Sequence, residues 1–244
     1  MHLGMRRQLS SSKLFLFCSR GLFLTSLLAL FGFAAAFAVD TQASLPPGYT
    51  VLRQLGKPCR ISLADLPWKL RDGDTRYSKV TRHAVEAWNS EGRRLGVGPF
   101  FQLVSEGEDL LLDWSGAGLP ADKAGGVFWD SNLGYRRAKS LAMDGGHRVP
   151  DGNRAEILMQ ELGHLLGLGD SVDPSDIMYP VMHTRRAYRL SSAALTERDR
   201  QSLSWLYAQS EWIPILKPKQ PFRRPAVTPN PGFTPLPLEP TPQE

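Results

Sequence analysis

The spacing of apolar residues predicts one domain built from both helices and strands. Val80, Ala84 and Trp88 recur at helical intervals, which predicts an amphipathic helix. We expect this helix to span residues 78–91 and to end at Gly92. Apolar runs of strand length, separated by turn residues, predict five strands. These strands cover residues 59–63, 100–104, 110–114, 125–129 and 139–143.

A second, more apolar helix is predicted after a glycine-rich loop over residues 144–152. Asn153 is a good N-cap residue and is expected to open this helix. The apolar residues that follow lie on more than one face, so the helix should be buried. They are Ile157, Leu158, Leu162, Leu165 and Leu166. A buried helix that also carries Glu161 and His164 needs partners for both polar side chains, which favours a functional site over a solvated face.

The first 38 residues have the pattern of a secretory signal peptide. They contain four basic residues and no acidic residue, an apolar run over residues 21–35, and the small-x-small cleavage site Ala36-Phe37-Ala38. The alternative is an uncleaved N-terminal anchor. The sequence therefore predicts an exported protein (secreted, periplasmic or at the cell surface), with no stable membrane span after cleavage.

Removing this segment lowers the net charge of the chain. The whole chain has 29 Lys and Arg against 24 Asp and Glu, and the loss of four bases leaves a net charge of +1. No basic stripe is interleaved with aromatic residues, so nucleic acid is not an expected partner. Cys59 is the one cysteine that remains, so no internal disulfide can form. We expect Cys59 to be a small residue entering the first strand.

The rest of the chain divides into three segments. Residues 39–57 are interpreted as a short linker and residues 58–211 as one domain with a hydrophobic core. Prolines crowd residues 212–244, which predicts a disordered or polyproline II tail. That tail is either an unstructured end or a ligand for a partner or a surface.

The strongest chemical pattern runs from Gln160 to Asp170. Residues four apart on a helix share a face, so Gln160 and His164 would point at the same metal ion. Glu161 lies beside them, placed to take a proton from a metal-activated water. Gly167 can end the helix with a positive φ, after which the chain turns back and Asp170 can reach the metal. Histidine and aspartate are ordinary zinc ligands, whereas the neutral amide oxygen of glutamine is a weak donor.

This stretch resembles the metzincin motif H-E-x-x-H-x-x-G-x-x-H, with Gln160 at the first histidine position and Asp170 at the third. Downstream, Asp176-Ile177-Met178-Tyr179-Pro180 resembles the methionine turn of the matrixins. Residues 195–207 resemble the last helix of that family, and Thr196 with Asp199 forms a capping box at its start. The resemblance covers residues 58–208.

The resemblance implies a fold of the α/β (α+β) class. The expected architecture is a twisted five-stranded mixed sheet, mostly parallel with one antiparallel edge strand. An active-site helix, a methionine turn and a C-terminal helix complete it. Periodicity alone predicts only one domain that contains helices and strands.

The resemblance also implies a zinc site. His164 and Asp170 would be ligands, Gln160 a weak third ligand, and Glu161 the general base. Each residue also has an ordinary structural interpretation: His164 as a hydrogen-bonded core histidine, Asp170 as a turn cap, and Gln160 as a helix-facing amide. Two further histidines, His147 and His183, lie near the motif but not at family ligand positions.

Other roles follow from the same resemblance. Met178 would form an apolar floor beneath the ligands without binding metal, while Tyr179 and Pro180 would form a wall of the substrate pocket. The substrate would be a polypeptide lying extended along the strand at residues 125–129. Acidic side chains near Asp144 and Asp151 are weaker candidates for a Ca²⁺ site. The protein is expected to be a monomer.

Three functions remain open from the sequence. The first is a secreted zinc-dependent metalloendopeptidase that hydrolyses peptide bonds with a metal-activated water and Glu161 as general base. The second is a pseudoprotease of the same fold that binds peptides without cleaving them, because Gln160 weakens the metal site. In the third, the domain is a passive carrier for the proline-rich tail, and a chain ending near Ala208 would fold unchanged.

Overall fold

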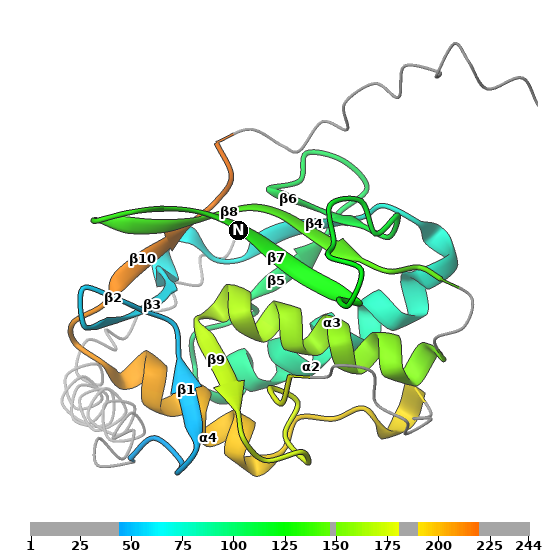
Figure 1. Cartoon of the computed structure of the whole chain (residues 1–244). Coiled ribbons are helices and arrows are strands. Elements are labelled where there is room, and N and C mark those ends of the chain that lie inside the picture. Colours follow the sequence, from blue (N-terminus) through cyan, green and yellow to red (C-terminus); the bar gives the residue numbers. More distant parts are fainter. Residues whose placement is uncertain (1–43, 147–149, 181–189, 220–244) are drawn as a thin grey trace, which may run out of the picture. The chain divides into compact units, whose positions relative to one another are not determined.

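The computed structural model describes residues 44–146, 150–180 and 190–219 (Figure 1). The elements in chain order are β1 (Tyr49–Val51), β2 (Arg53–Gln54), β3 (Lys57–Ile61), η2 (Leu63–Asp65), β4 (Trp68–Asp72), η3 (Thr75–Tyr77), α2 (Ser78–Arg94), β5 (Phe101–Leu103), β6 (Leu110–Asp113), β7 (Gly125–Asn132), β8 (Tyr135–Met143), α3 (Asp151–Leu166), β9 (Leu168–Ser171), η4 (Leu190–Ser192), α4 (Glu197–Ala208) and β10 (Ile213–Leu216).

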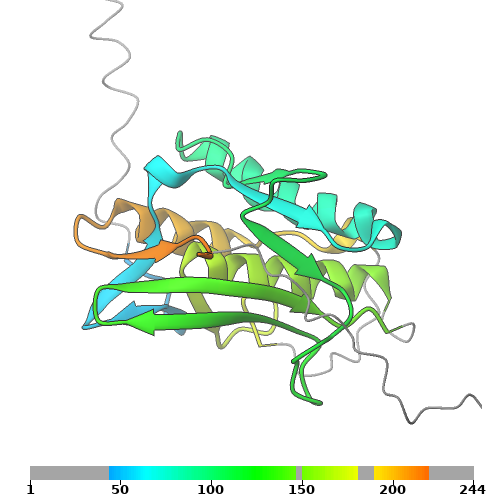
Figure 2. The same ribbon diagram turned by 90° about the horizontal axis from the view of Figure 1, so that it is seen from above.

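The central sheet contains the mixed arrangement expected from the resemblance. Strands β5, β4, β6 and β8 are parallel neighbours, and β7 pairs antiparallel with β8 along its length. Helices α2 and α3 lie together on one side of this sheet (Figures 1 and 2). The metzincin-like fold is therefore confirmed, with the antiparallel strand β7 beside the active-site helix.

The first strand of that parallel set is not the predicted one. Residues 59–63 were expected to hold it. A strand does form there, but β3 ends at Ile61 and joins the same eight-stranded sheet through β10, while β4 lies between β5 and β6. In β4, Trp68 and Leu70 are buried and Lys69 between them is exposed. This alternation has the period of a half-buried strand, but it is short and charged, which is why apolar runs alone did not reveal it.

Strand β10 corrects the predicted domain boundary. Residues from 212 onward were interpreted as tail, yet β10 pairs in parallel with both β3 and β8, and Ile215 is fully buried. Strand β8 pairs with β10 near Arg136 and with β6 near Leu141, so the two neighbours share one edge of this long strand. The proline-rich segment that follows, residues 220–244, lies outside the described residues.

Strand β1 corrects the other boundary. Residues 39–57 were interpreted as a linker, but β1 pairs antiparallel with β9. Tyr49 and Val51 are buried, so this segment belongs to the core. The structure thus places three strands from outside the predicted domain against it: β1 on β9, and β2 and β10 within the main sheet.

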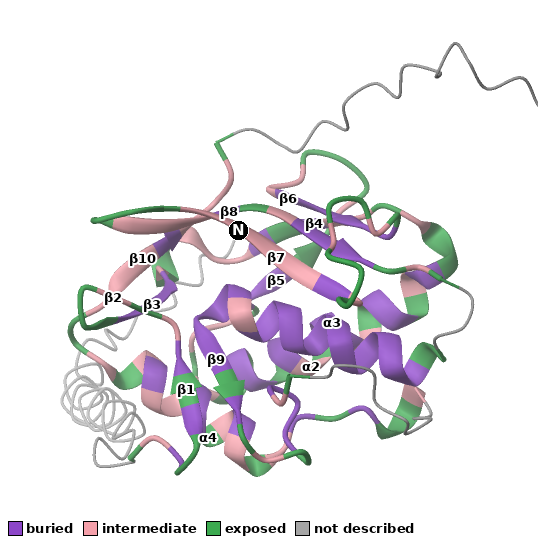
Figure 3. Ribbon diagram, viewed as in Figure 1, coloured by how far each residue is buried: buried purple, intermediate pink, exposed green. Residues whose placement is uncertain are grey.

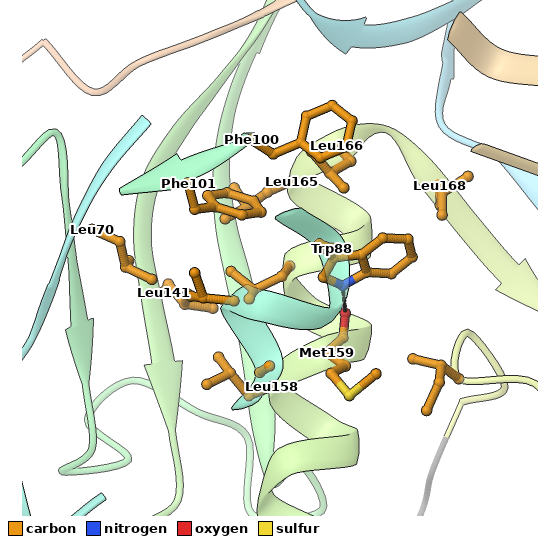
Figure 4. Packing of buried hydrophobic residues seen from close by; sticks show 14 of the residues in the cluster. Leu70, Trp88, Phe100, Phe101, Leu141, Leu158, Met159, Leu165, Leu166 and Leu168 are labelled. Carbon is orange, nitrogen blue, oxygen red and sulfur yellow. Dashed lines mark hydrogen bonds between the residues drawn. The ribbon is translucent and has the colours of Figure 1, made fainter. Parts of the chain in front are cut away.

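The core lies between the sheet and the two long helices (Figure 4). Trp88 of α2 is fully buried and its indole nitrogen donates to the carbonyl of Met159 on α3, at 2.8 Å. Gly92 does not end α2, because the helix continues to Arg94. A Cβ at position 92 would overlap the carbonyl oxygen of Gly98, so glycine serves a close approach rather than a helix end.

Within the part of the chain that the structure describes, no helix is both long enough and apolar enough to cross a membrane. The predicted signal peptide, residues 1–38, lies outside the described residues.

Candidate metal centre

Helix α3 carries the candidate residues through the middle of the core. Nearly all of its side chains are buried, as the burial colours show (Figure 3). The helix begins at Asp151 after an N-cap at Pro150, so the predicted N-cap Asn153 is wrong. Arg154 supports this first turn, because its guanidinium pairs with Asp151 at 2.8 Å and also donates to the carbonyl of Gly146.

Gly167 ends the helix and turns the chain back toward His164. It has a φ of 107°, which only glycine adopts readily. A Cβ there would also overlap the carbonyl oxygen of Cys59 in β3. The chain then enters β9, where Asp170 is exposed while Leu168 and Ser171 are buried. The predicted reversal of the chain at Gly167 is therefore present.

His164 and Asp170 approach each other across this turn. The imidazole Nε2 lies 3.6 Å from Asp170 Oδ1. The other ring nitrogen, Nδ1, is 3.0 Å from the carbonyl oxygen of Leu168. Because a carbonyl can only accept, Nδ1 carries the proton of this hydrogen bond, which leaves Nε2 as the ring nitrogen that faces Asp170.

Glu161 is buried beside the pair and tied to the edge strand. Its Oε2 accepts a hydrogen bond from the backbone N–H of Val127 in β7, at 3.1 Å. Burial raises the pKa of the Glu161 carboxyl above its ordinary value, partly offset by His164, by the Val127 N–H and by Lys123. A carboxylate in such surroundings is a better proton acceptor than one in water.

Gly125 allows this close contact between strand and helix. A Cβ at position 125 would lie 2.7 Å from Ile157 Cγ2 and 3.1 Å from Glu161 Cγ, so a larger residue would push β7 away from α3. The sequence analysis did not identify Gly125 as part of the site. The feature that could have identified it is the Gly125-Gly126 pair at the start of a predicted strand, because glycine in a strand often marks a place where another segment packs closely against the backbone.

A pocket of about 310 Å³ opens over these residues. Its lining comes from α3, from β9, from β7 and the loop before it, and from Pro180. The lining includes Gln160, Glu161, His164, Asp170, Lys123, Leu119, Pro120, Val127, Phe128, Ile157 and Pro180. All four polar residues selected from the sequence motif therefore face one pocket. Lys123 is a further cation there that the sequence analysis did not select.

The methionine-turn residues lie under the helix. Met178 is fully buried, and a Cβ at Gly163 would overlap its sulfur, so the side chain packs directly against the backbone of α3. Gly163 is the residue before His164, so this contact packs against the helix backbone next to the histidine. Tyr179 is partly buried and Pro180 lines the pocket.

Two buried carboxylates hold this turn in place. Asp199, at the start of α4, accepts hydrogen bonds from the backbone N–H groups of Ile177 at 3.1 Å and Met178 at 3.4 Å, and from the hydroxyl of Tyr49 at 2.8 Å. It also completes the predicted capping box with Thr196. The capping box was readable from sequence, whereas the long-range contacts were not.

Asp176 is the second carboxylate. It accepts from Ser171 Oγ at 2.5 Å, from Thr196 Oγ1 at 2.8 Å and from the guanidinium of Arg198 at 2.9 Å. Ser171 belongs to β9, so the network links the strand that bears Asp170 to the methionine turn and to α4. Asp176 is 1% exposed and is fully supplied with donors, as a buried carboxylate requires.

The remaining candidates are two histidines and two acidic residues. His147 and His183 lie outside the described residues. Asp151 pairs with Arg154, and Asp144 accepts the N–H of Gly146 at 2.8 Å, so both acids proposed for calcium have protein partners. Among the residues that the structure describes, no three His, Cys, Asp or Glu side chains converge as a metal site.

The donors present fit a zinc ion with two strong ligands. Two ligands that each stand about 2.0–2.1 Å from a tetrahedral zinc lie roughly 3.3 Å apart, close to the 3.6 Å between His164 Nε2 and Asp170 Oδ1. The carbonyl of Leu168 orients the imidazole, as is usual for zinc-binding histidines. Gln160 is buried and lines the same pocket.

Comparison with known proteins agrees with this description. A family model described as Matrixin (Peptidase_M10) matches residues 74–208, more than half of the chain. The matched segment contains the helix, the turn and both buried carboxylates. No curated protein matches the chain.

Proposed function

Because the chain belongs to the matrixin family, a family of zinc metallopeptidases, we propose that it is an exported zinc-dependent metalloendopeptidase. The single observation that carries the proposal is the convergence of His164, Asp170 and Glu161 on one pocket, with His164 and Asp170 at ligand spacing. The family implies polypeptide substrates.

His164, Asp170 and Gln160 would hold the zinc ion, which when bound supplies a Lewis acid and an activated water. Glu161 would take the proton of the attacking water on its carboxylate and return it to the leaving amine. Val127 fixes one oxygen of that carboxylate, so the other is the oxygen that moves the proton. Burial keeps bulk water from solvating Glu161 and favours its action as a base.

Strand β7 would bind the substrate. Among the described strands it pairs with β8 alone, so its other edge, apart from the Val127 N–H that donates to Glu161, offers N–H and C=O groups to an extended peptide. Residues 126–128 of this strand line the pocket next to Glu161. Tyr179 and Pro180 would close the pocket from the side of the methionine turn.

The second candidate is a pseudoprotease of the same fold, and the observation that favours it is Gln160. A neutral amide replaces a nitrogen ligand, and loss of one direct ligand should weaken zinc binding by more than the roughly 10–100-fold typical of changes around a ligand. The protein would then bind peptides in the same pocket without cleaving them.

Zinc content and proteolysis of the mature chain separate the two candidates. Residues 39–244 are purified, dialysed against trace zinc and assayed for metal per protein and for cleavage of an unfolded protein such as casein. The peptidase proposal expects about one zinc and cleavage that Glu161→Ala abolishes. No zinc and no cleavage in the native protein would reject it in favour of the pseudoprotease. Export is tested separately, by sequencing the N-terminus of the protein recovered outside the cell.

A further inference from the structure

The aspartate ligand at position 170 depends on a strand from outside the matched family segment. We propose that β1, through Thr50, positions Asp170 for metal binding. The inference rests on the proposed zinc site. Strand β1 precedes residues 74–208, and the sequence analysis had placed it in a linker.

The pairing of β1 with β9 contains a bulge at the ligand. Tyr49 pairs with Ser171 and Val51 pairs with Leu168, so two residues of β9, Gly169 and Asp170, oppose the single residue Thr50. A β-bulge changes the direction of the side chains that it contains, because the extra residue breaks the regular alternation between the two faces. Here the bulge leaves Asp170 exposed toward the pocket while Ser171 remains buried.

Thr50 makes the contacts that fix this bulge. Its hydroxyl donates to the carbonyl oxygen of Asp170 at 2.8 Å. A Cβ at position 169 would overlap the same hydroxyl and would lie 3.1 Å from the carbonyl carbon of Thr50, so glycine is required there for the close approach. The hydroxyl therefore contacts the backbone of both bulge residues.

The rest of β1 anchors Thr50. The N–H of Leu52 donates to the carbonyl of Gly167 at 2.8 Å, and the N–H of Val172 donates to the carbonyl of Gly48 at 3.0 Å, so hydrogen bonds flank the bulge on both sides. Tyr49 is buried and reaches Asp199 at 2.8 Å, which ties the strand to the floor of the site. Thr50 is thus held by contacts that do not involve Asp170.

Aspartate makes this support important. Its side chain is shorter than that of the histidine expected at this position, so its reach to a metal depends more closely on where its backbone lies. Gln160 is a weak donor, and the affinity of the site then depends mainly on His164 and Asp170. A small displacement of the Asp170 backbone should therefore be measurable as lost zinc affinity.

The test compares Thr50→Val with the matched control Thr81→Val in residues 39–244. Thr81 is a buried threonine on α2 whose hydroxyl donates to Asp72 at 2.8 Å, outside the pocket. Zinc affinity is measured by competition with a chelator, and thermal stability is measured on the same samples. We expect Thr50→Val to lower zinc affinity about 5–10-fold, the usual value of one hydrogen bond, and Thr50→Ser to retain it. Gly169→Ala should lower affinity further.

Thr81→Val should lower stability without changing the affinity of the folded protein for zinc. Equal affinity in Thr50→Val and the native protein would overturn the proposal, as would an equal loss in both threonine variants. The same variants are repeated with Gln160→His, which supplies a histidine at the first ligand position. Zinc binding only in that background would reject the native zinc site, and the effect of Thr50 would still be measured there.

Amide hydrogen exchange of the metal-free protein provides an independent readout. Faster exchange at residues 168–171 in Thr50→Val, but not in Thr81→Val, is expected if Thr50 holds the bulge. Unchanged exchange at these residues would overturn the proposal even if neither background takes up zinc.

Discussion

The two sides of the turn around His164 are built differently. On the pocket side, Gln160 and Asp170 replace two of the three histidines of the family motif, and the donors form a partial ligand set. On the opposite side, Asp176 and Asp199 are buried with several donors each, and Met178 is packed against the helix. We call Asp176, Asp199 and Met178 with their hydrogen-bond partners the support of the site. Its contacts are all made although the ligand positions are altered.

This difference shows that the support does not depend on a metal for its stability. Its hydrogen bonds join β9, the methionine turn, α4 and β1 without any contribution from the ligands. We therefore expect the protein to fold without zinc. We also expect substitutions in the pocket to change zinc affinity, and substitutions in the support to change folding stability.

The largest expected effect comes from removing β10, which lies in the main sheet outside this support. A chain that ends at Glu211 would expose the edges of β3 and β8 and lose the buried side chain of Ile215. We expect it to lose cooperative unfolding, as measured by circular dichroism and urea titration. A chain that ends at Lys219 keeps β10 and should unfold like the full-length protein. Normal folding of the shorter chain would show that β10 is dispensable, as the carrier hypothesis predicted.

Asp199→Ala should give the next largest effect. The substitution leaves the buried N–H groups of Ile177 and Met178 and the hydroxyl of Tyr49 without their acceptor. We expect a loss of about 4 kcal/mol in the free energy of unfolding, since each unsatisfied buried donor costs about 1–3 kcal/mol. Urea titration measures it, with the exposed Glu211→Ala as control. A loss below about 1 kcal/mol would contradict the central role of this carboxylate.

Gln160→His should change the pocket side without changing the support. Restoring a nitrogen ligand is expected to raise zinc affinity by roughly 10–100-fold or more, while the free energy of unfolding without zinc changes by less than about 1 kcal/mol. Gln160→Ala distinguishes a weak ligand from none. If it leaves zinc affinity unchanged, the amide of Gln160 does not bind the metal.

His164→Ala should remove zinc binding while the metal-free fold remains. The side chain is partly exposed and its Nδ1 has one hydrogen bond, to the carbonyl of Leu168. Its loss should therefore cost about 1 kcal/mol of stability. Zinc retained at the native level would mean that the ion is bound elsewhere.

Glu161→Gln should give the smallest effect on stability, with the opposite sign. Burial raises the Glu161 pKa, so folding disfavours the charged form of this carboxyl at neutral pH. Its contribution to the free energy of unfolding is therefore lost as pH rises through its folded pKa. In chelator, Glu161→Gln should thus raise the Tm at pH 7 and leave it nearly unchanged below the ordinary pKa of glutamate. In the presence of zinc the same change should abolish cleavage without releasing the metal. A lower Tm at pH 7 would show that the carboxylate stabilises the fold.

The motif residues were selected from the sequence because their spacing is local. Gln160, Glu161 and His164 share one helix, and Gly167 turns the chain so that Asp170 can reach them, so helical spacing together with this turn predicts that they meet. The capping box of Thr196 and Asp199 was found for the same reason, since its two members are three residues apart. Each of these features needs only the chain near it.

The sequence by itself thus determined the helix that bears the site, the turn after it and the family fold that their residues resemble. Only the tertiary structure placed β1 beside Asp170, β10 inside the sheet, Asp199 under Met178 and Gly125 against Glu161. Those contacts join residues far apart in the chain, and strand pairing is fixed by the partner strand rather than by the short segment itself. A three-residue strand such as β1 is too short for its sequence to predict its partner strand, yet its pairing with β9 contains the bulge that includes Asp170.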